Sequence, residues 1–254
     1  MSIEIKGVII GEGKPKVCVP IVESHDEAIL NKLKEFNELE VDMIELRIDF
    51  YENIHQEDAL RNLFLNIAAL QIQKPVILTI RTAAEGGEVE IDPKDYFNVY
   101  KLAVEANAFD IYDVELALGT NMAIELRTLI HDAGKYMLMS SHNFRTPEVD
   151  SLMQKFRSMD SLEADIMKVA VMPEDYQDLL NLLSFTVQAK HEYAQKPIVT
   201  MSMSSIGLTS RLVGEQFGSA ITFATVGKAS APGQIDYQEL NQMLDIIHKN
   251  IQEA

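Results

Sequence analysis

Residues 166–172 read Ile-Met-Lys-Val-Ala-Val-Met, an apolar and β-branched run whose only charge is Lys168. A run of this length and branching is typical of a buried strand rather than of a helix. Seven similar runs occur along the chain, at residues 17–20, 43–49, 75–81, 109–116, 136–144, 197–203 and 220–226. Stretches with helical periodicity separate them, and this alternation predicts a parallel sheet with helices outside it.

The number of these units indicates how the sheet is closed. Eight strand and helix units over 254 residues favour a closed (β/α)8 barrel, the TIM barrel, over an open doubly wound sheet. An open sheet usually carries a glycine-rich phosphate turn after its first strand, whereas residues 20–24 read Pro-Ile-Val-Glu-Ser. We therefore predict an α/β fold, formed by one (β/α)8 barrel domain over residues 1–254, without a nucleotide site.

Turn and cap residues predict several boundaries. The segment from Glu4 to Lys16, with Gly11-Glu12-Gly13 as its turn, is interpreted as an N-terminal hairpin that covers the barrel floor. Helix starts are predicted at Ser24 with Glu27, at Asp92-Pro93 and at Thr146-Pro147, and a helix stop at Gly134.

The composition limits the partners. The formal net charge of −17 repels nucleic acid and anionic membrane surfaces, and no apolar run approaches the roughly 20 residues that span a bilayer. A small anionic substrate remains compatible if cations gather locally. The single cysteine, Cys18, and the absence of a cationic and apolar leader at residues 1–6 predict a cytoplasmic protein.

A lysine in a buried strand is unusual, because its charged ammonium has to leave water. Removing an ammonium from water favours the uncharged amine, and this is the form that attacks a carbonyl carbon. The first hypothesis is therefore imine chemistry. The alternative is a lysine at a strand end whose stem packs while its head reaches water or an acid.

Polar residues also lie near the C-terminal ends of other predicted strands, where barrel active sites form. Those that share the inward parity are Glu45, Arg47, Thr79, Arg81, Asp113, Glu115, Ser140, His142 and Lys168. The carboxylates could be glycosidase acids or metal ligands, but neighbouring arginines and a lysine favour a charge-balanced ring. No cluster has transition-metal spacing, so we predict metal-free chemistry.

His142 stands apart from the other five histidines, which fall within or beside helical stretches. It lies where its strand meets a loop, next to the strand of Lys168. Histidine can move protons near neutral pH, and Glu85 could orient its ring. The alternative is a hydrogen-bonded structural histidine.

Three further features have two interpretations each. Arg211 could grip a carboxylate with two hydrogen bonds or form a surface ion pair. The small-residue loop at 228–234 could be a lid or an ordinary loop. Met201 and Met203 are interpreted as core residues, with substrate contact as the alternative.

Taken together, these motifs make the chain similar to the type I 3-dehydroquinate dehydratase family, the Schiff-base enzymes of the shikimate pathway. The resemblance runs from Val17 to the last helix. It is carried by Glu45-Leu46-Arg47, Arg81 with residues 85–88, Asp113-Val114-Glu115-Leu116, Ser140-Ser141-His142-Asn143-Phe144, Met167-Lys168-Val169-Ala170, residues 200–203, Ser210-Arg211 and residues 230–234. Ala117 and Ser205-Ile206 depart from the family pattern without touching these motifs.

The resemblance implies roles for individual residues. Lys168 would form the imine with 3-dehydroquinate, His142 would move protons, and Glu85 would support His142. Arg211 would hold the substrate carboxylate. Residues that would bind hydroxyls or position the lid are Glu45, Arg47, Arg81, Ser230 and Gln234. The product would be 3-dehydroshikimate, no cofactor would be needed, and the protein would be a homodimer.

Two other functions remain open at this stage. A class I aldolase shares the barrel and the imine but breaks a carbon–carbon bond. A non-catalytic barrel could bind shikimate-like acids as a sensor, although a simple binder would not require Lys168 and His142 on adjacent strands.

Overall fold

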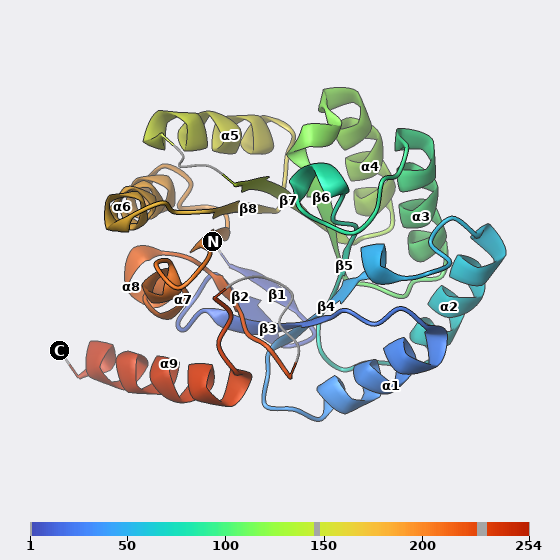
Figure 1. Cartoon of the computed structure of the whole chain (residues 1–254), viewed down its shortest axis with the longest axis horizontal. Helices are drawn as coiled ribbons and strands as arrows, with labels where there is room; N and C mark the ends of the chain where they lie inside the picture. The colour runs from blue at the N-terminus through green and yellow to red at the C-terminus, as the bar shows by residue number, and fades with distance from the viewer. Residues whose placement is uncertain (1, 145–147, 228–232, 254) are drawn as a thin grey trace.

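The chain folds into a nearly closed barrel of eight parallel strands with helices around it (Figure 1). This computed structural model describes residues 2–144, 148–227 and 233–253. The barrel strands are β3 (Lys16–Ile21), β4 (Met43–Arg47), β5 (Val76–Thr79), β6 (Ile111–Glu115), β7 (Tyr136–Asn143), β8 (Ile166–Val171), β9 (Ile198–Ser202) and β10 (Ile221–Phe223). The predicted TIM barrel is confirmed.

The strands pair in the order β10-β3-β4-β5-β6-β7-β8-β9. Between β9 and β10 the ring is joined by a single parallel bridge of Ile198 to Ser219, beside a 2.7 Å bond from Ala220 N to the Ile198 carbonyl. In the register of β7 and β8, Ser140 lies opposite Lys168 and His142 lies opposite Ala170. The predicted inward-facing residues of these two strands are therefore neighbours.

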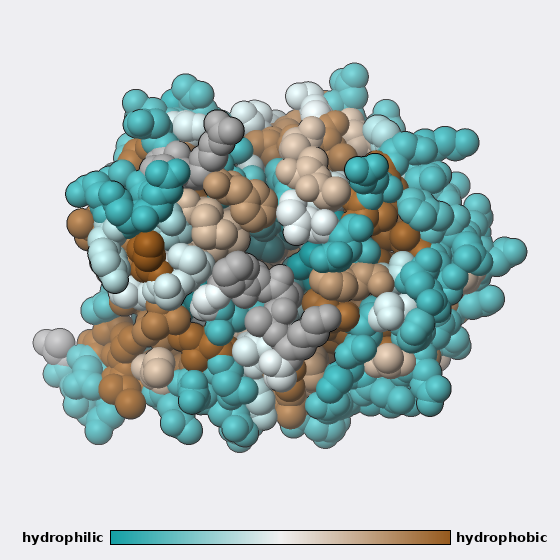
Figure 2. Space-filling view, viewed as in Figure 1, coloured by the Kyte–Doolittle hydropathy of each residue, from teal (hydrophilic) through white to brown (hydrophobic). Residues whose placement is uncertain are grey.

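Helices follow the strands in sequence. They are α1 (Asp26–Asn37), α2 (Glu57–Ala69), α3 (Pro93–Glu105), α4 (Thr120–Asp132), α5 (Val149–Ser161), α6 (Tyr176–Glu192), α7 (Leu208–Leu212), α8 (Gly214–Phe217) and α9 (Tyr237–Gln252). Three short 3-10 turns follow strands, namely η1 (Ile48–Phe50), η2 (Ala83–Glu85) and η3 (Leu116–Leu118). Among the helices of the described ranges, none is both long and apolar enough to cross a membrane. In the face that Figure 2 shows, hydrophilic side chains gather mainly around the edge, with hydrophobic patches between them.

The period of two along each strand produces two cores. Outward-facing residues such as Val19, Leu78 and Val169 pack with the helices in the larger cluster. Inward-facing residues at the N-terminal ends of the strands form a separate apolar layer, made of Cys18, Met43, Ile77, Ile111, Leu138 and Ile166. The inward positions that follow along the strands are mostly charged or polar, so the barrel interior changes character along its axis.

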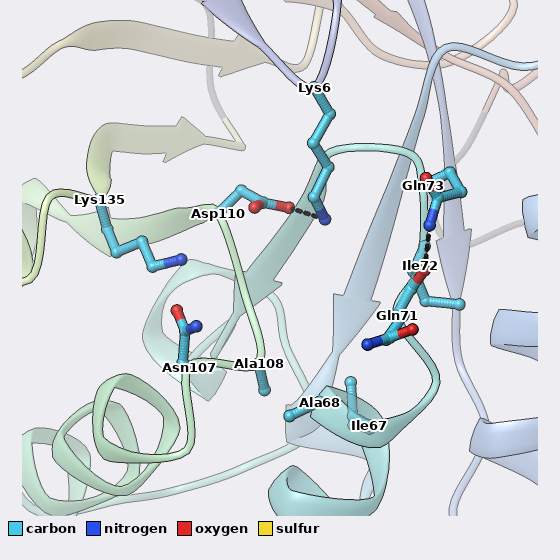
Figure 3. A pocket seen from close by; sticks show the side chains of 10 residues that line it. All are labelled: Lys6, Ile67, Ala68, Gln71, Ile72, Gln73, Asn107, Ala108, Asp110 and Lys135. Carbon is cyan, nitrogen blue, oxygen red and sulfur yellow. Dashed lines mark hydrogen bonds and ion pairs between the residues drawn. The ribbon is translucent and has the colours of Figure 1, made fainter.

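A two-stranded antiparallel hairpin, β1 (Ile3–Ile5) and β2 (Val8–Ile10), closes the apolar end. Ile5 and Ile10 join the inner apolar layer. Figure 3 shows the hairpin turn at the same end, where the Lys6 ammonium donates to Asp110 Oδ2 at 2.7 Å beside a shallow polar pocket. A floor-covering hairpin was predicted, and the structure has one.

The predicted turn of that hairpin was wrong. The turn is Lys6-Gly7, whose φ angles of 49° and 79° are the positive pair that a tight two-residue hairpin needs. Gly11 and Gly13 instead lie in the connection to β3, although both also have positive φ.

The helix boundaries were predicted with mixed success. Asp92 caps α3 by accepting from Asp95 N, with Pro93 as the first helical residue, as predicted. Gly134, at φ 69°, follows α4 as predicted. The Ser24 cap is wrong: α1 begins after an extended His25, because the Ser24 carbonyl accepts from Glu52 N in the loop after β4. The predicted start at Thr146-Pro147 lies outside the described residues, and α5 follows Glu148.

Candidate active site

A pocket opens at the C-terminal ends of the barrel strands. It is lined by Glu45, Arg47, Arg81, His142, Lys168, Ala170, Met201, Met203, Arg211, Phe223 and Gln234. Seven of these are among the nine predicted site residues. Of the other two, Glu85 lies behind His142, and Ser230 falls outside the described residues.

Lys168 lies on β8 with a side chain that is only 5% exposed. Its Nζ donates to Asp113 Oδ2 at 3.1 Å and lies 3.9 Å from Glu45 Oε1. The ring of Phe223 faces the same nitrogen, with its centroid 4.6 Å away. The amine is therefore held at a fixed place in the pocket by its contacts with Asp113, Glu45 and Phe223.

Asp113 and Arg81 form the centre of a buried charge network. The Arg81 guanidinium lies 2.9 Å from Asp113 Oδ2, 2.7 Å from Glu115 Oε1 and 3.5 Å from Glu85 Oε2. The Ser140 hydroxyl also donates to Asp113. Burial alone would raise the pKa of Asp113, but Arg81 and Lys168 outweigh it, so this pKa lies below its ordinary value. Asp113 is therefore ionised and can balance two cations.

His142 and Glu85 form a hydrogen-bonded pair on the other side of this network. One oxygen of Glu85, Oε2, accepts from the His142 backbone N at 3.0 Å and lies 2.9 Å from Nδ1 of the ring. When Glu85 is ionised it accepts from Nδ1–H, and the lone pair of the ring is then on Nε2. Burial, together with Arg81 and Lys168, holds the pKa of His142 well below its usual value. The ring is therefore neutral and able to accept a proton at Nε2.

The pKa of Glu85 moves in the opposite direction. Burial and the nearby charge of Glu115 raise it to about 7, against the opposing influence of Arg81. Strongly shifted pKa values on two neighbouring groups are more common at functional sites than elsewhere in a protein.

The short turn η2 brings Glu85 to His142. Thr82 fixes the start of the turn, because its N and Oγ1 donate to Glu115 at 3.0 and 2.7 Å. Gly87 lets the chain fold back tightly, since a Cβ at this position would lie 1.8 Å from the Arg81 carbonyl oxygen. The predicted orientation of the His142 ring by Glu85 depends on this local path of the backbone.

Arg47 is held by a residue that the sequence analysis did not single out. Its Nε and Nη2 donate to the two oxygens of Asp49 at 2.8 and 2.7 Å. Its guanidinium also lies over the ring of Phe50, 5.1 Å from the centroid. Glu45, two residues earlier on β4, accepts from Thr79 Oγ1 at 2.9 Å. Both predicted binding groups of β4 therefore have fixed orientations.

Arg211 enters the pocket from α7 and is 2% exposed. Burial lowers the pKa of its guanidinium to about 10, which leaves it cationic at neutral pH. A surface ion pair, the alternative interpretation of this arginine, does not fit a buried side chain. Gln234 also lines the pocket, from the described end of the 228–234 loop.

The apolar side of the pocket was largely missed from sequence. Met201 and Met203 of the β9 region are buried, as their interpretation as core residues predicted, and Met201 belongs to the inner apolar layer; both also line the pocket. Phe223 was not predicted, because one aromatic residue in a strand run looks like any core residue. Closure of the barrel brings β10 next to β3 and places the aromatic ring of Phe223 over the Lys168 amine.

The arrangement fits carbonyl chemistry on an anion. A carbonyl carbon can meet the Lys168 amine, an adjacent acidic C–H can meet the neutral His142, and Arg211 can bind a carboxylate. Within residues 2–144, 148–227 and 233–253, no group of three or more His, Cys, Asp or Glu side chains is placed to hold a metal ion.

Comparison with known proteins gives a consistent result. The model of the Type I 3-dehydroquinase family matches residues 17–251. The 3-dehydroquinate dehydratase of Bacillus subtilis (strain 168) is 41% identical over 97% of this chain and 97% of its own length. That of Clostridium novyi (strain NT) is 37% identical over 97% and 98%.

Solved structures agree in fold. The crystal structure of type I 3-dehydroquinate dehydratase from Clostridium difficile with covalent modified comenic acid has a TM-score of 0.94 at 37% identity, covering 98% of this chain and 99% of that one. The Enterococcus faecalis 3-dehydroquinate dehydratase has a TM-score of 0.89 at 38% identity, covering 96% and 98%.

The pKa of Glu85 predicts a pH-dependent stability. An acid whose folded-state pKa is raised, here from 4.5 to about 7, contributes stability that is fully present below pH 4.5 and is lost as the pH rises through 7. Replacing the carboxyl by the amide in Glu85→Gln removes this loss. We therefore expect the melting temperature of Glu85→Gln minus that of the wild type to increase between pH 5 and pH 8 in calorimetry. A constant difference over this range would contradict the raised pKa.

Proposed function

The chain belongs to the type I 3-dehydroquinase family, and on this basis we propose that it dehydrates 3-dehydroquinate to 3-dehydroshikimate through an imine on Lys168. The observation that carries the proposal is the position of a buried lysine amine in the same pocket as a neutral, carboxylate-bound histidine. The reaction is a step of the shikimate pathway.

The proposed reaction begins with the Lys168 amine. The amine attacks the ketone carbon, and loss of the carbonyl oxygen as water gives a protonated imine. This cation draws electrons from the neighbouring carbon, so Nε2 of His142 can remove its proton and leave an enamine. The enamine then expels the β-hydroxyl, which takes the proton from His142 and departs as water. Hydrolysis of the conjugated imine consumes one water, releases the enone and restores the amine, so the net change is the loss of one water.

The remaining residues bind the substrate in this proposal. Arg211 holds the carboxylate with two parallel hydrogen bonds. The substrate hydroxyls and the lid are the partners of Glu45, Arg47, Arg81, Ser230 and Gln234. In this proposal Arg211, which lines the pocket, attracts the small anion on a chain with a net charge of −17.

A structurally similar relative supports covalent chemistry. The Clostridium difficile enzyme was solved with covalent modified comenic acid. By analogy, a covalent bond between an organic acid and this chain would form at Lys168, the amine that lines the pocket.

Lys168→Met tests the imine. The thioether keeps the volume but cannot bond the substrate, so turnover should fall to background, and borohydride should no longer trap substrate mass on the protein. Lys155→Met is a matched control, because Lys155 is a half-buried lysine outside the pocket, bonded to Ser141. This control should still be trapped, with the modified peptide containing residue 168. Trapping in Lys168→Met, measured by intact-protein mass spectrometry, would contradict the proposed imine.

His142→Ala tests the proton transfers. Removing a general acid and base slows such steps roughly 10²–10⁴-fold. Both elimination and imine hydrolysis should slow, so a covalent adduct should accumulate even without borohydride. Rapid-quench mass spectrometry measures this adduct, and normal turnover in the variant would remove His142 from the mechanism.

The products distinguish a dehydratase from a class I aldolase. Release of 3-dehydroshikimate gives ultraviolet absorbance from its conjugated enone, whereas an aldolase yields two carbon fragments. Binding of 3-dehydroquinate without formation of either kind of product would instead indicate a non-catalytic barrel that senses shikimate-like acids.

We further propose that the chain acts as one barrel domain, as a homodimer, and in the cytoplasm. Exposed apolar side chains on α6 (Tyr176, Leu180 and Val187) and on α9 (Met243 and Ile246) support pairing. Figure 2 shows apolar side chains gathered over α9. The buried free thiol of Cys18 is compatible with a reducing compartment. Solution scattering should give twice the mass of 28.6 kDa, and the mass of a monomer would refute the dimer.

A further inference from the structure

Asp49 is a buried carboxylate at the mouth of the barrel with no role in the reaction proposed above. It lies in η1, directly after β4, and its side chain is 0% exposed. Its two oxygens accept from four N–H groups: Arg47 Nε, Arg47 Nη2, Arg81 N and Glu88 N. Burying an ionised carboxylate is costly unless its oxygens accept hydrogen bonds. Each oxygen of Asp49 accepts one bond from the Arg47 side chain and one from the backbone of the 81–88 loop.

One half of this arrangement fixes a side chain. The Nε and Nη2 bonds of Arg47 to Asp49 form a parallel pair, which sets the plane of the guanidinium. Arg47 lines the pocket, so the plane that Asp49 sets is also the plane that a bound hydroxyl would meet. Glu45, its neighbour on the inward face of β4, is oriented separately by Thr79.

The other half fixes a loop. Arg81 N donates to Asp49 Oδ1 at 3.2 Å and Glu88 N donates to Asp49 Oδ2 at 3.3 Å. These two residues flank η2, which carries Glu85 to the ring of His142. Asp49 therefore holds both ends of the loop whose middle supports the proton-transfer pair.

We infer that Asp49 is a positioning residue that sets Arg47 for substrate binding and holds the 81–88 loop so that Glu85 meets His142. The inference rests on the proposed function, because it deepens the roles given there to Arg47, Glu85 and His142. Asp49 does not itself reach the pocket, and its influence passes through these three residues.

Asp49→Asn is the sharpest test, because it keeps the size and replaces one acceptor oxygen by an N–H donor. In either orientation that donor would face one N–H group of Arg47 and one of the loop, Arg81 N or Glu88 N, so the paired bonds to Arg47 and both loop contacts cannot all persist. The KM for 3-dehydroquinate should rise roughly tenfold or more as Arg47 loses its orientation. A looser loop admits water to Glu85, whose pKa is raised first by burial, so the acid limb of the kcat/KM profile should move to lower pH.

Asp110→Asn is a matched control at the opposite end of the barrel. Asp110 is a partly buried carboxylate directly before β6, where it accepts from Val76 N and from the Lys6 ammonium. Its variant should lose stability in calorimetry while KM and the acid limb keep their wild-type values. A merely structural role for Asp49 would give this same pattern, with a smaller folded fraction and an unmoved pH profile, and would overturn the inference.

A double-mutant cycle separates the two halves. If Asp49 affects KM through Arg47, then Asp49→Asn should raise KM no further in an Arg47→Ala background, while the shift of the acid limb remains. Additive effects on KM would overturn the link to Arg47. Wild-type protein that does not turn over 3-dehydroquinate would refute the proposed function itself. Wild-type turnover with unchanged KM and pH profile in Asp49→Asn would refute only the role of Asp49.

Discussion

The site depends on the burial of opposite charges inside the C-terminal half of the barrel. Asp113 is shared by Arg81 and Lys168, and Glu115 is shared by Arg81 and Thr82. Taking any one of these ions out of water costs several kcal/mol, and only mutual pairing offsets that cost. Each member is therefore stable only with the others present, which makes the network one unit. This explains why the charges occupy successive strands rather than scattered positions.

The geometry of the strands determines how these buried charges are stacked along the barrel axis. Side chains on a strand alternate between faces, so the inward positions of each strand form successive layers along the barrel axis. An apolar layer that includes Ile111 and Ile166 lies beneath Asp113 and Lys168, and it separates the charges from water at that end. His142 lies one inward position further along β7 than Ser140, the residue opposite Lys168. The period of two places both layers inside the barrel, and the residues at successive inward positions make the lower layer mostly apolar and the upper layers mostly polar.

Much of this could be predicted from sequence, for reasons that particular residues show. The apolar runs and their parity predicted that Lys168 and His142 face inward on adjacent strands, because both signals are local. Asp49 was missed because its contacts reach 39 residues ahead to Glu88, which no local pattern reveals. Phe223 was missed because its contact with Lys168 exists only once the sheet curves into a ring. The hairpin turn was misplaced because Gly11-Glu12-Gly13 is a stronger turn signal than Lys6-Gly7, although φ is positive in both segments.

The hairpin at the barrel floor determines where substrate enters and where product leaves. Ile5 and Ile10 close the end of the barrel that faces away from Lys168, so the interior is open only at the other end. Reactant, product and any expelled solvent molecule must then exchange through the rim where the strands end. A leaving product therefore competes with an incoming acid for the same passage. Product must therefore leave the pocket before the next substrate enters, because molecules cannot pass through the barrel from one end to the other.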